Sequence, residues 1–150
     1  MAELNYNSSP TEVKDAVHAG KLICFKPSVP WVGEPRVFLK TVLLDGQIDA
    51  ALTCGDGPRV ARWEKLLADI SAFVEGALIN WALMKWLDPK KYEHWELRSV
   101  RPRPSLRVFG RFACPDVFVG THVVERAPQR REAPRRRDRR RREGHADCHW

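Results

Sequence analysis

Apolar residues recur at helical spacing through the middle of the chain. From Arg59 to Leu87 they fall three or four positions apart, which predicts one long helix of about eight turns. Asp88 and Pro89 end the pattern, because proline disfavours a helical conformation in the residue before it. The second half of this helix, 77–87, is apolar on nearly every side. We therefore expect it to be buried in the core or in a partner interface.

The N-terminal part predicts a short helix followed by a strand. Ser9 supplies a hydroxyl cap, and Pro10 stands at the first helical position, where its missing N–H costs nothing. The helix is expected to run to about His18 and to end at Gly20, since glycine readily takes the left-handed conformation that stops a helix. The next residues, Lys21 to Lys26, are typical of a short strand.

Three strand-like runs close the body of the chain: Tyr92 to Val100, Leu106 to Ala113, and Val117 to Glu125. Prolines and an aspartate occupy turn positions between them, which predicts a three-stranded antiparallel meander. Helices followed by such strands indicate an α+β fold. The stretch 36–44 fits a strand imperfectly and a short helix no better, and the Gly- and Asp-rich residues 53–58 predict a loop.

Charge divides the chain into two unlike parts. The formal net charge is +7, but residues 1–125 hold 16 basic and 15 acidic side chains, whereas residues 126–150 hold 10 Arg, no Lys and four acids. The last 25 residues have no apolar pattern. We therefore predict a single α+β domain over 1–125 and a disordered Arg-rich tail over 126–150. Arginine without lysine is also what GC-rich DNA yields when read out of frame, so the tail is either a nucleic-acid arm or a non-native end.

Several classes of protein are disfavoured by what the sequence lacks. The four cysteines are scattered, with no C-x-x-C pair, so neither a zinc knuckle nor a redox motif is supported. The polar first 15 residues do not resemble a signal peptide, and charged residues interrupt the longest apolar segment, so no membrane span is expected. Motifs of common hydrolases, nucleotide-binding loops and zinc proteases are missing. We expect a cytoplasmic protein without metal or cofactor.

Basic residues gather on the predicted strands. Arg98, Arg107 and Arg111, with His122 beyond them, suit RNA because guanidinium groups pair with phosphate oxygens and stabilise charge on a transferring phosphoryl group. Arg107 and Arg111 have the same parity, so both leave one face of the sheet. In a hairpin with a three-residue turn, His122 pairs with Val108 and faces the core. A turn one residue longer or shorter reverses that, and an exposed, solubilising face is the alternative for the arginines.

Other arginines are candidates for non-specific, salt-dependent contacts to the RNA backbone. They stand after the first strand of the meander and in the tail: Arg101, Arg103, Arg126, Arg130 and Arg131.

Residues 92–125 resemble part of the RelE/ParE-like toxin superfamily, in its phage-derived, HigB-type branch. Trp95-Glu96-Leu97-Arg98 is similar to the "W-E-L-R" strand of that branch, Leu106-Arg107-Val108-Phe109 to its "y-R-v-l-Y" strand, and Val117 to Val124 to its last strand. The resemblance implies metal-independent cleavage of ribosome-bound mRNA by basic residues on the sheet. By this resemblance, Arg98 and Arg107 occupy the catalytic positions of the family.

Two functions from different classes follow. The first is a RelE/ParE-like toxin, or a toxin-derived relative, that acts on RNA or the ribosome. The second is a non-enzymatic, phage-related or accessory protein-interaction module with a basic C-terminal arm. It would bind an antitoxin-like partner or a second copy through the 77–87 helix. The first function is favoured if four side chains converge in one concave site: Arg98, Arg107, Arg111 and His122. It is contradicted if these side chains lie apart on the surface.

Overall fold

The computed structural model describes residues 8–27, 36–87 and 93–127. The helices are α1 (Pro10–His18), α2 (Val42–Leu52) and α3 (Gly57–Val74). The strands are β1 (Leu22–Cys24), β2 (Val37–Thr41), β3 (Met84–Trp86), β4 (Trp95–Ser99), β5 (Ser105–Cys114) and β6 (Val117–Arg126). All six strands join one sheet in the order β1-β2-β6-β5-β4-β3. The predicted α+β class is confirmed.

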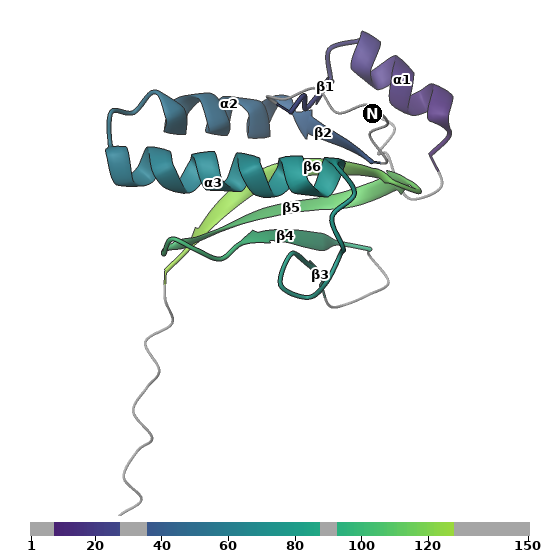
Figure 1. Cartoon of the computed structure of the whole chain (residues 1–150). Coiled ribbons are helices and arrows are strands. Elements are labelled where there is room, and N and C mark those ends of the chain that lie inside the picture. The colour runs from purple at the N-terminus through teal and green to yellow at the C-terminus, as the bar shows by residue number, and fades with distance from the viewer. Residues whose placement is uncertain (1–7, 28–35, 88–92, 128–150) are drawn as a thin grey trace, which may run out of the picture.

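The sheet is larger than predicted and it is mixed. β2 pairs in parallel with β6, while the other neighbouring strands pair antiparallel. The strands β4, β5 and β6 are thus part of a six-stranded sheet and do not form a separate three-stranded one. Helices α2 and α3 lie side by side along one face of the sheet (Figure 1). No helix in the described part of the chain is both long enough and apolar enough to cross a membrane.

Two apolar clusters hold the elements together on opposite sides of the sheet. The larger lies under α2 and α3, where Phe38, Phe73 and Phe118 are fully buried and the Phe73 and Phe118 ring centroids are 6.1 Å apart. The smaller packs α1 against the other face, through residues such as Val13 and Leu39. Phe38 and Leu39 are adjacent in β2, so the alternation along this one strand serves both clusters.

The N-terminal helix is confirmed with its cap. The Ser9 Oγ accepts from the Glu12 N–H at 3.2 Å, and the Glu12 Oε2 accepts from the Ser9 N–H at 2.6 Å. This reciprocal pair satisfies two of the N–H groups that a helix start leaves without partners. Gly20 follows the helix with φ +69°, as expected for a residue that stops it.

The predicted long helix is wrong beyond Val74, where α3 ends. Gly76 has φ +89°, and the N–H groups of Gly76 and Ala77 bond back to the carbonyls of Phe73 at 3.2 Å and Ala72 at 2.9 Å. This is a Schellman stop, which requires a left-handed residue after the helix. The apolar positions beyond it continue the helical spacing but belong to a loop, 77–83, and to β3. A short apolar run does not by itself distinguish a helix from a strand.

The ambiguous stretch 36–44 contains the whole of β2 and the first residues of α2. Thr41 closes β2, and its Oγ1 accepts from the Leu44 N–H at 3.2 Å, which caps α2. The same hydroxyl donates to the Thr121 carbonyl at 2.6 Å. The helix then continues to Leu52, a segment for which the sequence analysis predicted no helix. The tail residues 128–150, and with them the prediction of disorder, lie outside the described residues.

Candidate functional site

The basic residues predicted on the strands lie on the face of the sheet that points away from α2 and α3. Leu97 and Val108 are fully buried and pair across β4 and β5, on the helix side. The residues that alternate with them point the other way. We call this the outer face, and over β3 to β6 it carries Lys85, Glu96, Arg98, Arg107, Phe109, Arg111 and His122.

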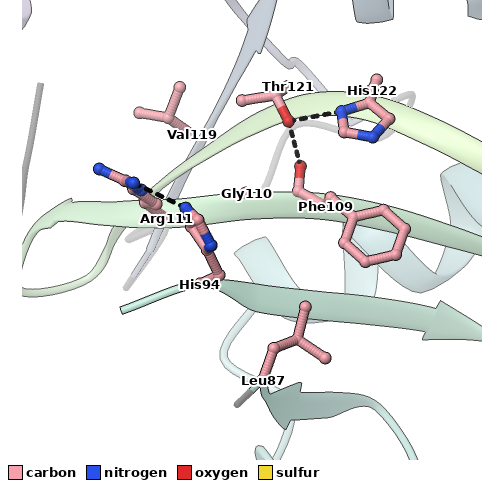
Figure 2. Close-up of a pocket in the computed structure, with 8 residues that line it drawn as sticks. All are labelled: Leu87, His94, Phe109, Gly110, Arg111, Val119, Thr121 and His122. Carbon is pink, nitrogen blue, oxygen red and sulfur yellow. Dashed lines mark hydrogen bonds between the residues drawn. The ribbon is translucent and has the colours of Figure 1, made fainter. Parts of the chain in front are cut away.

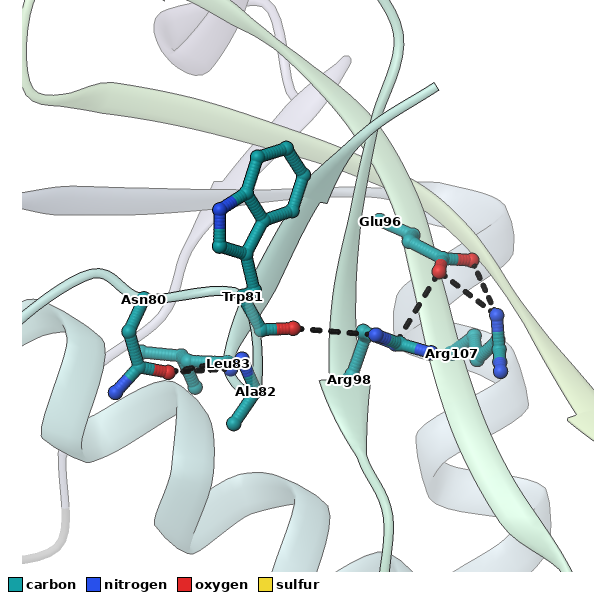
Figure 3. A network of polar contacts seen from close by, with 7 residues as sticks. All are labelled: Asn80, Trp81, Ala82, Leu83, Glu96, Arg98 and Arg107. Carbon is teal, nitrogen blue, oxygen red and sulfur yellow. Dashed lines mark hydrogen bonds and ion pairs between the residues drawn. The ribbon is translucent and has the colours of Figure 1, made fainter. Parts of the chain in front are cut away.

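Arg98 and Arg107 both bind one buried carboxylate. Glu96 is 2% exposed, and its two oxygens accept from the Arg107 Nη1 at 2.7 and 2.8 Å. The Arg98 Nε lies 3.2 Å from the Glu96 Oε1, and its Nη1 donates to the Trp81 carbonyl at 3.1 Å (Figure 3). The carboxylate offsets one of the two positive charges. The main role of this cluster is therefore structural, because it links β4, β5 and the 77–83 loop. It keeps one net positive charge.

A separate hollow of about 220 Å³ opens on the same face around Gly110. Figure 2 shows Arg111 and His94 on one side of Gly110 and Phe109 with His122 on the other. Leu87, Val119 and Thr121 complete the lining. Two of the four predicted catalytic residues, Arg111 and His122, thus meet in one concave site. Arg98 and Arg107 lie outside its lining.

A bulge in β6 places His122 in this hollow. The register runs Gly110 with Gly120 but Phe109 with His122, so Thr121 is an extra residue on β6. An extra residue in a strand moves every later side chain of that strand to the opposite face of the sheet. The predicted pairing of His122 with Val108, which put it in the core, is therefore wrong. Its ring instead stacks on Phe109 with centroids 5.3 Å apart and planes at 15°.

The hydrogen bonds around Thr121 fix which nitrogen of His122 carries a proton. The Thr121 hydroxyl donates its one proton to the Phe109 carbonyl at 2.9 Å. Its oxygen is 2.9 Å from the His122 Nδ1 and can only accept there. The Nδ1 is therefore the protonated nitrogen. In the neutral ring the Nε2 then keeps a free electron pair, as a general base requires.

His94 is a site residue that the sequence analysis did not single out. Its Nε2 lies 2.6 Å from the Arg111 Nη2, and arginine has no acceptor, so the histidine nitrogen accepts. This bond orients the guanidinium of Arg111 at the edge of the hollow. The sequence could have predicted this position for His94. Positions 94, 96 and 98 alternate along the chain, so they share one face of the sheet once β4 is extended by one residue.

The remaining predicted RNA contacts lie at the other end of the sheet. Arg101 and Arg103 are exposed in the loop between β4 and β5, and Arg126 is exposed where β6 ends opposite Ser105. The pairing of β5 with β6 brings these arginines near one another, and all three lie away from the hollow. Residues 130 and 131 lie outside the described residues.

Within the described residues, no group of three or more His, Cys, Asp or Glu side chains is placed to hold a metal ion. Comparison with protein-family models, curated proteins and solved structures found no match for this chain.

Proposed function

We propose that the chain is an RNA-directed protein of the RelE/ParE-like type, a toxin or toxin-derived relative that cleaves RNA without metal if it is active. The observation that carries the proposal is the meeting of Arg111, His94 and His122 in one hollow of the outer face. Phosphoryl transfer on RNA needs a base to take the 2′-hydroxyl proton and a positive group to stabilise the phosphoryl charge, and both line this hollow. The similarity of β4 and β5 to that family's strand motifs gives further support.

The chemistry assigned to the hollow is attack of a ribose 2′-oxygen on the adjacent phosphorus. The His122 Nε2 takes the 2′-hydroxyl proton while the oxygen bonds to phosphorus. Arg111 stabilises the extra negative charge on the phosphoryl oxygens, and His94 positions Arg111. The bond from phosphorus to the 5′-oxygen breaks, and that oxygen takes a proton from solvent. The products are a 2′,3′-cyclic phosphate and a 5′-hydroxyl.

Arg98 and Arg107 take a different role from the one that the family resemblance implies. Their ion pairs with Glu96 make them positioning residues, which hold β4 and β5 together and leave one net positive charge near the path of the RNA backbone. We therefore expect variants of Arg107 to lose stability as well as activity. Variants of Arg111 should lose activity alone.

The test is cleavage by the full chain of single-stranded RNA in excess EDTA, and of ribosome-bound RNA in the magnesium that keeps ribosomes assembled. Cleavage is expected for the wild type, with a loss of about 100-fold or more in Arg111→Ala and in His122→Ala. Arg59→Ala, an exposed arginine on α3 at the opposite face of the sheet, is the matched control and should keep full activity. Wild-type cleavage by Arg111→Ala removes the site assignment. No cleavage of either substrate, with no growth arrest on induction, contradicts the function.

A protein-interaction module is the second candidate, and the 77–83 loop favours it. Leu78 is 81% exposed and Trp81 68% exposed, so two large apolar side chains stand in solvent next to the outer face. Light scattering on a sizing column tests for self-association through them. An oligomer that dissociates in Trp81→Glu, but not in the control Leu43→Glu on α2, supports this function. An unchanged monomer contradicts self-association through this loop.

A further inference from the structure

The hollow around Gly110 has the chemistry of a binding site for one unstacked nucleotide. We infer that it holds a single base of a single-stranded RNA against Phe109 and His122, with an adjoining phosphate on Arg111. This inference rests on the proposed RNA-directed function and goes further, because it assigns a base-binding role to Phe109, which the cleavage step does not use.

The size and the lining of the hollow suit one base. About 220 Å³ corresponds to roughly seven water molecules, at about 30 Å³ each. That accommodates one heteroaromatic ring system and is below the usual volume for a drug-sized ligand, about 300–1,000 Å³. Apolar side chains, Leu87 and Val119, line it together with the backbone of Gly110. A base pair of a duplex does not fit, so the ligand is a base outside any helix.

The ring pair supplies the stacking surface. Phe109 and His122 are stacked with nearly parallel planes, so each ring covers one face of the other and a third ring can stack on the remaining face of the pair. Proteins that bind single-stranded RNA stack unpaired bases on aromatic side chains or on arginine planes in this way. Arg111 stands on the opposite side of Gly110 and offers both a planar cation and a phosphate partner (Figure 2).

Gly110 keeps the floor of the hollow close to the core. A Cβ there would lie 2.2 Å from the Val119 carbonyl oxygen and 2.6 Å from the Phe118 ring. β5 can therefore lie tightly on Phe118 at this point, while the outer side of the glycine leaves room between Phe109 and Arg111. The other cavities fit a nucleotide less well. The one between Phe25 and α3 is lined by two carboxylates, and the one under α1 has no arginine and no phenylalanine among the described residues that line it.

The test compares two fluorescein-labelled 2′-O-methyl RNA strands of equal length, which cannot react through the 2′-oxygen. One carries bases, and the other is abasic throughout, so it keeps the charge and loses the stacking. The full chain should bind the base-bearing strand about tenfold or more tightly than the abasic strand. In Phe109→Leu that preference should disappear. Arg111→Gln should weaken the binding of both strands by a similar factor.

Phe112→Leu is the matched control, because Phe112 lies on the same strand but packs against Phe118 and Trp95 on the helix side. It should keep the preference for bases even if its melting temperature falls. Equal affinity of the wild type for both strands overturns this inference and leaves the proposed function standing. No binding of either strand overturns the proposed function and the inference with it.

Discussion

Removing the carboxylate that joins Arg98 and Arg107 is the sharpest test of the outer face. The substitution Glu96→Gln keeps the size of the side chain and one acceptor, but it leaves two arginines directly opposite each other on β4 and β5 with no negative charge between them. Breaking a fully buried ion pair costs about 3–5 kcal/mol. The Arg107 and Arg98 side chains are 14% and 25% exposed, so water screens part of the repulsion. We expect a loss of about 2–3 kcal/mol.

Thermal and urea unfolding measure this loss, which corresponds to a fall in Tm of about 5–10 °C for a chain of this size. Glu125→Gln is the matched control. Its carboxylate is 43% exposed and 3.3 Å from the Arg62 Nη2, so its removal should cost under about 1 kcal/mol. A double-mutant cycle with Arg107→Gln should give a coupling of at least about 1 kcal/mol. A coupling energy near zero, or a loss of stability no greater than that of Glu125→Gln, would show that the pairing of Glu96 with the two arginines does not stabilise the fold.

Three further predictions concern stability and the tail. Gly120→Ala should lower the free energy of unfolding by about 1–3 kcal/mol in urea titrations, because its Cβ would lie 2.7 Å from Leu44 and 2.8 Å from Phe38; an unchanged midpoint contradicts this packing. Ser9→Ala should cost about 1 kcal/mol by removing the α1 cap, with Ser9→Asp as a control that keeps an acceptor. A chain ending after residue 127 should melt cooperatively at the wild-type temperature, because the tail lacks the apolar residues needed to pack against the domain. Loss of cooperative unfolding would show that the tail supplies an element of the fold.

Local signals were enough to predict several elements of the fold. The Ser9 cap with Pro10 placed α1, and the alternating runs placed β4, β5 and β6, because caps and period-two patterns act over a few residues. The end of α3 was missed although Gly76 marks it, because the apolar spacing continues past the glycine into a loop and β3. There the apolar side chains satisfy sheet packing, as when Trp86 stacks on Trp95 with centroids 5.4 Å apart. Periodicity alone does not separate these outcomes.

The position of His122 shows why the site was harder to predict than the fold. Parity along β5 correctly put Arg107 and Arg111 on one face, since it needs no partner strand. The facing of His122 depends on the pairing of β5 with β6, and one extra residue at Thr121 reverses it. That bulge has a local cause in the structure: the Thr121 carbonyl accepts from the Thr41 hydroxyl, while its own hydroxyl donates to Phe109. The contact to Thr41 joins positions 80 residues apart, so no window of sequence contains it. The hydroxyl that caps α2 thus also donates to the bulge, and the bulge is what turns His122 toward the outer face.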